Sequence, residues 1–369
     1  MARLTRAQQQ GRTRAAVLAA SRQEFSEHGY AEAKVDRIAE RAELTRGAVY
    51  SNFPSKRALY LAVLVELVEQ TPTGMAPASS PGPAGGLGAF ARAWLERLPL
   101  VDEPPAAGHL QLRSLAGVVG DEPARTALAQ VTRLEALLLA LALESGRPRR
   151  GGRVRRVRLA ELVLTLLNGS GHLAEVAPGF GDPFDVVRAC EQLAGIDLAD
   201  TWDPPHLPYV VPAQPCQDRW VPPADLPDQL TGRRVGFDAA GVVAVLGTSR
   251  LEAAEEAVRA ARPGDRVTVV VVTGDAAELG RLVRLRISDL TGCLRRAFAP
   301  GGWPRLHLVL DDQAQLASAI GVPDADDATE AAVRIEAGAI VARAHGRGAA
   351  HAAATAGAPD SSPSGQAGA

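Results

Sequence analysis

The stretch that decides the fold runs from Val35 to Lys56 and reads VDRIAERAELTRGAVYSNFPSK. Its apolar residues recur at i, i+3, i+4 and i+7 from Val35 to Ala42, which predicts a short amphipathic helix. After a brief turn, Thr45 can cap a second helix, and Pro54 ends that helix. Two short helices joined in this way predict a helix-turn-helix unit.

The second of these helices has one large-residue face and one small-residue face. Its spacing directs Val49 and Phe53 inward and places Gly47 and Ser51 near the centre of the opposite face. A helix whose outward residues are small can enter the major groove of DNA, which is roughly 12 Å wide. The sequence therefore predicts a helix that reads base edges.

Residues 12–65 resemble the TetR family of bacterial transcriptional regulators. The motifs that carry the resemblance are Ile38-Ala39, Thr45-x-Gly47, Tyr50-x-x-Phe53-Pro54 and Ser55-Lys56. The resemblance implies a homodimeric, sequence-specific regulator that binds an inverted-repeat operator. It also implies, as the family default, a repressor that is released by a small-molecule inducer. Double-stranded DNA and a second copy of the chain are the expected partners.

The helix geometry and the resemblance together point to a set of DNA-contacting residues. These are Lys34, Thr45, Arg46, Gly47, Ala48, Tyr50, Ser51, Asn52 and Lys56. Arg46 can reach a guanine edge bidentately, and a phosphate contact is the open alternative. The other open readings are a cap alone for Thr45, core packing for Tyr50 and a solvated surface charge for Lys56.

Two positions depart from the family pattern. Glu43 stands where the family usually has glycine between the second and third helices, so it places a negative charge near the DNA. Ala33 and Lys34 stand where Thr or Ser usually starts the second helix, which weakens the cap but adds a cation. Thr13 is the predicted cap of the first helix.

Residues 61–200 are predicted to form a helical ligand-binding and dimerisation domain, after a DNA-binding domain over residues 1–60. The resemblance implies pairing through the last two long helices, whose place residues 154–177 and 183–196 hold. The ligand contacts predicted by position alone are Trp94, His109, Leu112, Leu115 and Leu138. His109 and His172 can equally be ordinary polar or core residues, and the arginine-rich stretch 147–158 reads as a solvated loop.

The period of the pattern changes in the C-terminal part. Residues 201–232 are proline-rich and are predicted to be a semi-rigid linker, and 347–369 a disordered tail. Between them, β-branched runs begin at Val242, Val267, Leu306, Ala332 and Ala339, with helical segments between the early ones. Residues 233–346 resemble a thioredoxin-like or peroxiredoxin-like α/β domain. The expected fold class is therefore multidomain, all-α followed by α/β.

The redox chemistry of that resemblance is missing. The stretch from Gly247 to Glu252, where a catalytic thiolate would lie, contains no cysteine, and Glu330 stands at the place of the family's cis-proline. Cys216 and Cys293 are expected to be inert. We therefore expect no catalytic residues, cofactor or metal; the alternatives are a redox enzyme or thiol-based sensor, and a scaffold that recruits a protein.

Charge and hydropathy indicate where a polyanionic partner would bind and in which compartment the protein is expected. Residues 1–57 carry eleven Lys/Arg and six Asp/Glu, about +5, although the 369-residue chain has a net charge of −2. This asymmetry puts a polyanionic partner at the N-terminus. The sequence lacks a signal-peptide pattern, and no apolar run of about 18 residues is expected to span a bilayer. The expected location is the cytoplasm, with no membrane contact.

Overall fold

The N-terminal head of the protein consists of α1 (Arg6–Glu32), α2 (Val35–Arg41) and α3 (Arg46–Asn52), which are joined to the rest by α4 (Lys56–Gln70). The structure is a computed structural model that describes residues 5–70, 82–97, 115, 117–145, 155–177, 179–203, 206–299, 303 and 305–357. The head is built around an apolar cluster in which Phe25 and Tyr60 meet edge to face at 4.9 Å between ring centroids.

The first helix begins earlier than the sequence predicts. Thr5, not Thr13, is its N-cap, and Thr5 forms a reciprocal capping box with Gln8. Such a box satisfies two backbone N–H donors at once, so it fixes the helix start better than a lone threonine inside a continuous helical pattern.

The helical body is formed by α5 (Gly82–Leu95), α7 (Glu122–Ser145), α8 (Val157–Val176) and α9 (Pro183–Leu193). The sequence was expected to contain no apolar run long enough to span a membrane, and α7 shows that this expectation was wrong. Among the described residues it is the one helix long and apolar enough, and 67% of its apolar window is buried inside the protein. Its leucines face neighbouring helices on several sides, as a core helix requires.

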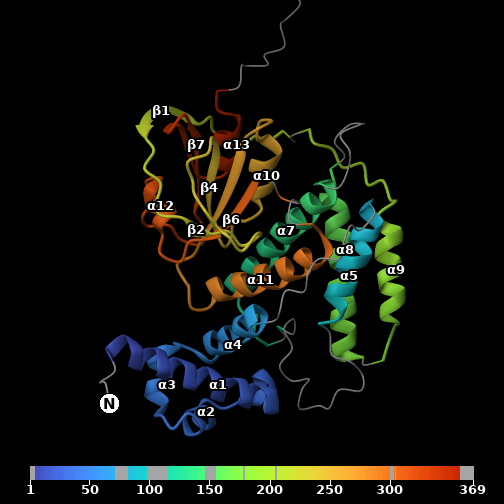
Figure 1. The fold of residues 1–369 in the computed structure, drawn as a ribbon, viewed down its shortest axis with the longest axis vertical. Helices are drawn as coiled ribbons and strands as arrows, with labels where there is room; N and C mark the ends of the chain where they lie inside the picture. Colours follow the sequence, from blue (N-terminus) through green and yellow to red (C-terminus); the bar gives the residue numbers. More distant parts are fainter. Residues whose placement is uncertain are drawn as a thin grey trace, which may run out of the picture.

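The C-terminal region is built on a six-stranded sheet of order β1-β8-β7-β4-β5-β6 (Figure 1). Its strands are β1 (Gln214–Arg219), β4 (Gly241–Gly247), β5 (Arg266–Val272), β6 (Leu306–Leu310), β7 (Glu330–Glu336) and β8 (Ala339–His345). Strands β4, β5 and β6 are parallel neighbours, whereas β7 and β8 form an antiparallel hairpin. The predicted strand–helix–strand units and hairpin are confirmed, and the thioredoxin-like identity stays a prediction.

The remaining elements around the sheet are β2 (Leu226–Pro227), β3 (Arg234–Val235), α10 (Ala253–Ala260), α11 (Leu279–Ala297), α12 (Gln315–Ala319) and α13 (Ala349–Thr355). One sheet face presents Val242, Ala244 and Leu246 to the body side, and the other presents Val243 and Val245 to a separate cluster. This alternation follows from the two-residue period of a strand.

Two segments are more ordered than their composition predicts. The predicted linker 201–232 contains β1, which pairs with β8 at the sheet edge. Proline is tolerated in an edge strand because it has no N–H to donate and the outer side of such a strand has no partner strand. The predicted tail 347–369 begins with α13, whose alanines pack against β7 and β8. Small side chains permit this close approach, and residues beyond 357 lie outside the described part.

Helix α11 connects the three regions. It follows β5 in the chain, yet it packs against α4, α5 and α7 (Figure 1). Leu279, Leu282 and Leu285 belong to the apolar cluster of the head, and Ile287 and Leu294 belong to the cluster of the body. The C-terminal region therefore supplies a helix to the core of the N-terminal half, and the head is held against it through α4.

Candidate nucleic-acid interface

The turn between α2 and α3 sets the angle of the predicted reading helix. Thr45 is the N-cap of α3, and its hydroxyl accepts a hydrogen bond from the Ala48 amide at 3.2 Å. Glu43 adopts a left-handed conformation with φ of 54°. This conformation explains why the resembling family favours glycine here, since a Cβ is strained in that region.

Helix α3 exposes the face that the sequence predicts. Val49 and Phe53 are buried in the head, whereas Gly47 and Ser51 are exposed. A Cβ added at Gly47 would meet only the Thr45 hydroxyl, at 3.9 Å, so the surface in front of it is open. The centre of the α3 face is therefore solvent-exposed and carries only small side chains.

The polar side chains of α3 are held by local hydrogen bonds. The Ser51 hydroxyl and the Asn52 amide both donate to the Ala48 carbonyl, at 2.8 and 2.9 Å. The Arg46 guanidinium lies 3.4 Å from the Asp36 carboxylate and 5.5 Å from the Tyr50 ring centroid. The interactions with Tyr50 and Asp36 raise the pKa of Arg46, which keeps this exposed side chain cationic.

Lys34 and Lys56 flank the face with positive charge. Lys34 is exposed at the start of α2, without a side-chain cap. The Lys56 ammonium donates to the Ala31 carbonyl at 2.9 Å and lies 5.0 Å from the Tyr30 ring centroid, and partial burial lowers its pKa. Lys56 is thus anchored at the end of α1 and is not a freely solvated charge. Tyr50 packs partly against the head core, and this position is compatible both with core packing and with a DNA contact.

A buried carboxylate braces α1 against α2. Glu24 accepts hydrogen bonds from the Lys34 amide at 3.0 Å and from Arg37 at 2.6 Å. Burial opposes its ionisation, but these bonds prevail and lower its pKa. Glu24, Glu27 and His28 lie close enough to share a cation, and the two carboxylates are here neutralised by Arg37 and Arg41.

The joint between the head and α11 was missed by sequence reasoning. Glu278 accepts hydrogen bonds from Ser55 and Arg57 at the start of α4, and Arg57 also pairs with Asp121. Burial opposes the charge on Arg57, but Asp121 and Glu278 raise its pKa. Because Glu278 lies more than 200 positions from Ser55 and Arg57 in the chain, no local pattern could reveal these contacts.

The predicted ligand residues are not gathered around one cavity in the described residues. Trp94 and Leu138 are buried in the core of the body, and Leu115 packs against the cluster of the head. His109 and Leu112 lie outside the described residues. These five positions stay a prediction.

The end of the sheet where a thioredoxin-like thiolate would lie is filled by a closed polar network. Thr248 and Thr273 both donate to Asp327, at 2.7 and 2.6 Å. Arg250 pairs with the buried Glu330, whose other oxygen accepts the Gly348 amide at 2.7 Å.

The three cysteines lie outside this polar network. Cys190 and Cys293 are buried, and burial raises the pKa of Cys190 to about 11. Cys216 on β1 donates to the Ile340 carbonyl. A raised pKa disfavours the thiolate, so Cys190 lacks the feature that makes a cysteine reactive.

Comparison with known proteins identifies the head. The sequence model of the family described as "Bacterial regulatory proteins, tetR family" matches residues 17–63. The chain carries the DNA-binding domain of the TetR family. This homology supports a DNA-binding transcriptional regulator, and the match covers α2, α3 and most of α1 and α4.

Several solved structures of regulators, two of them described as TetR-family, are similar to about half of this chain. A regulator from Rhodococcus sp. RHA1 is 20% identical, with 50% of this chain and 94% of that chain covered and a TM-score of 0.31. A putative regulator from Mesorhizobium loti MAFF303099 is 16% identical, with 52% and 96% covered and a TM-score of 0.25. The fatty acid degradation regulator FadR from Bacillus halodurans is 18% identical, with 51% and 97% covered and a TM-score of 0.27. No curated protein matches the chain.

Proposed function

We propose that this TetR-family protein is a cytoplasmic, ligand-responsive repressor that binds an inverted-repeat operator as a homodimer. The observation that carries the proposal is the exposure of Gly47 and Ser51 on α3 while Val49 and Phe53 are buried. Small outward residues let a helix approach base edges, and the proposal assigns Arg46 at its first turn two hydrogen bonds to guanine.

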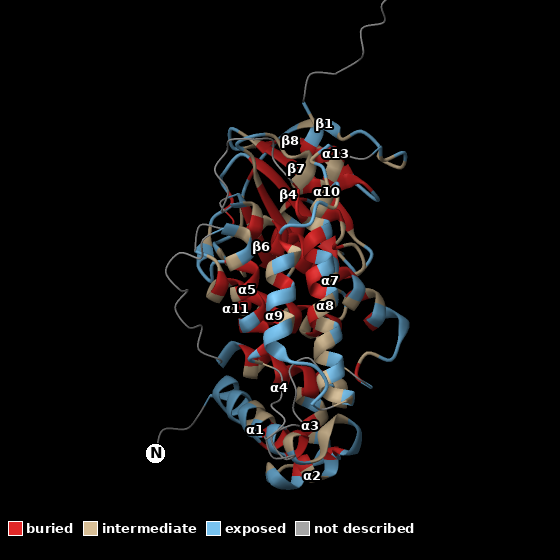
Figure 2. Ribbon diagram, turned by 90° about the vertical axis from the view of Figure 1, so that its right-hand side faces the viewer, coloured by how far each residue is buried: buried red, intermediate tan, exposed pale blue. Residues whose placement is uncertain are grey.

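The surface of α8 and α9 supports dimerisation. Six large apolar side chains on these helices, between them and just after α9 are exposed: Leu162, Leu173, Val176, Phe180, Phe184 and Ile196. Figure 2 shows α9 largely pale blue along its outward face. Soluble monomers rarely leave such a patch uncovered, and a second copy of the same patch would cover it with two-fold symmetry.

Selection of bound duplexes from a random DNA pool tests the proposal. We expect purified full-length protein to enrich an inverted repeat whose half-sites are about one helical turn or more apart. We also expect affinity for that repeat to fall steeply as salt rises. Weak binding without sequence preference would contradict the proposal.

A further inference from the structure

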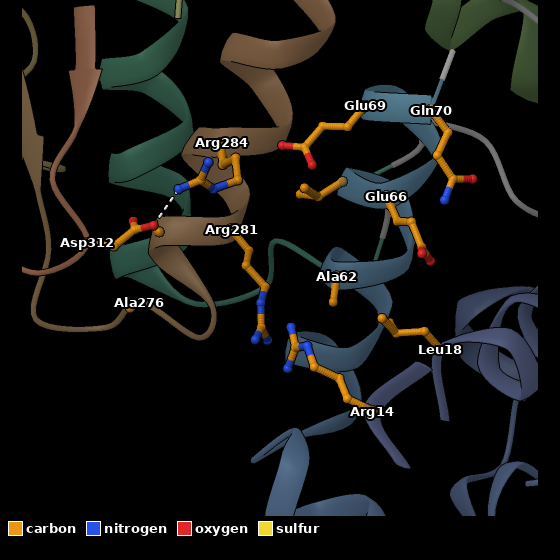
Figure 3. Close-up of a pocket in the computed structure, with 12 residues that line it drawn as sticks. Arg14, Leu18, Ala62, Glu66, Glu69, Gln70, Ala276, Arg281, Arg284 and Asp312 are labelled. Atoms are coloured by element: carbon orange, nitrogen blue, oxygen red, sulfur yellow. Dashed lines mark hydrogen bonds and ion pairs between the residues drawn. The ribbon is translucent and has the colours of Figure 1, made fainter. Parts of the chain in front are cut away.

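A cleft lies between the head and the C-terminal region. It has a volume of about 600 Å³ and opens between α1 and α4 on one side and α11 on the other (Figure 3). This volume lies within the usual range for a small-molecule site. The cleft is separate from Trp94 and Leu138 in the helical body.

Two arginines converge at one end of the cleft. Figure 3 shows Arg14 from α1 and Arg281 from α11 reaching toward one another. Their guanidinium carbons lie 4.5 and 5.3 Å from the centroid of the buried Phe53 ring. Two like charges that share one aromatic ring repel each other, and an anion between them would relieve that repulsion.

Neither arginine approaches a carboxylate within ion-pair distance among the described residues. Arg281 donates to the Ala58 and Ala277 carbonyls, at 2.9 and 3.0 Å, from one nitrogen only. Burial and the nearby Arg14 both lower the pKa of Arg281. By contrast Arg284, one turn further along α11, is paired with Asp312. The Arg14–Arg281 end therefore has unmet capacity for an anion.

The rest of the cleft has a different character. Leu18, Ala62 and Val65 form an apolar wall, and Glu66 and Glu69 on the last turns of α4 supply acceptors without a described partner. We infer that the cleft binds a small molecule with a phosphate or carboxylate at the arginines and an amino or hydroxyl group facing Glu66 and Glu69. Charge-assisted bonds at both ends would orient it.

Such a ligand would join α1 of the head to α11 of the C-terminal region. If DNA binding changes the affinity for this ligand, the ligand changes the affinity for DNA by the same factor. That consequence rests on the proposed function, whereas the binding itself does not.

Calorimetric titration of the full-length protein without DNA tests the inference. The probes are O-phosphoethanolamine, inorganic phosphate and ethanolamine. We expect one site per chain for O-phosphoethanolamine, weaker binding of phosphate and none of ethanolamine. Arg14→Gln should weaken O-phosphoethanolamine binding by roughly tenfold or more. Arg12→Gln, an equal charge change at an exposed position of α1, should leave it unchanged.

The inference is overturned if neither phosphate probe binds at millimolar concentration, or if Arg12→Gln and Arg14→Gln have equal effects. Binding of phosphate as tight as that of O-phosphoethanolamine would also overturn it, because Glu66 and Glu69 would then have no role. Arg14 makes no hydrogen bond among the described residues, but it contacts the Phe53 ring, so circular dichroism checks that Arg14→Gln is folded. Arg281→Gln is compared at a temperature where it stays folded. Operator binding in a protein that fails with every probe would contradict this inference alone.

Discussion

Arg286 on α11 lies 2.6 Å from Glu135 on α7, and both side chains are buried. Burial opposes the charge on Arg286, but Glu135 raises its pKa, so the guanidinium stays ionised. The two residues are 151 positions apart in the chain. This ion pair, in the core between the body and the C-terminal region, makes α11 a structural part of the N-terminal half.

Replacing Glu135 by glutamine should destabilise the whole protein. Removing one partner leaves a buried, uncompensated charge, which costs about 3–5 kcal/mol of unfolding free energy. Urea denaturation checks this value. The control is Glu96→Gln, just after α5, which breaks its exposed pair with Arg296 of α11 and should cost less than about 1 kcal/mol. Equal costs for the two variants would show that the Glu135 pair is not a structural link.

Acid should weaken the head through Glu24. Its folded pKa lies below the reference value of 4.5, so its stabilising bonds are fully present above that pH and are lost as pH falls through the folded value. Glu24→Gln should cost about 1–3 kcal/mol at neutral pH and flatten the acid limb of the stability curve. Circular dichroism between pH 3 and about 7 measures both effects.

The matched control for Glu24 is Glu40→Gln, at an exposed position of α2. It should leave both the neutral-pH stability and the acid limb unchanged. An acid limb as steep in Glu24→Gln as in the wild type would assign the effect to other carboxylates.

Glutamate at Phe184 should break the dimer. Phe184 is 75% exposed on α9, and a charge buried in a two-fold interface would face its own copy. Sedimentation velocity should then report a monomer, with operator affinity reduced by roughly tenfold or more. Val211→Glu, at a 70% exposed position outside α8 and α9, should stay dimeric. A dimeric Phe184→Glu would place the interface elsewhere.

Glycine at Glu43 should stabilise the head. The left-handed conformation of this residue costs about 1 kcal/mol with a Cβ, and glycine removes that cost. Glu43→Gln removes the charge and keeps the strain, so it separates the two effects. Both variants should bind DNA a few-fold more tightly at low salt, while only Glu43→Gly should melt at higher temperature. A higher melting temperature for Glu43→Gln would assign the cost to charge.

The reading helix was predictable because its signals are local. The cap at Thr45, the inward Val49 and Phe53 and the stop at Pro54 all lie within ten residues, and the structure places each of the apolar residues as predicted. Strand runs such as Val267–Val272 were predictable for the same reason, since a buried parallel strand is apolar throughout.

The docking of α11 was not predictable from one sequence. An amphipathic pattern reports that a helix has a partner and does not say which one. Buried arginines mislead in the same way. Arg155 lies in a stretch that reads as a solvated loop, yet it is buried against Glu144, Glu255 and the Trp202 ring. Long-range pairs of this kind become visible only in three dimensions.

The central claim is that the small-residue face of α3 contacts base edges. The most direct measurement compares Gly47→Leu with Gly11→Leu by fluorescence anisotropy on the selected duplex. Both glycines are helical and exposed, and a Cβ at either has open space, so both variants should fold. We predict that Gly47→Leu loses roughly tenfold or more in affinity and Gly11→Leu does not. Unchanged affinity for Gly47→Leu would contradict the claim.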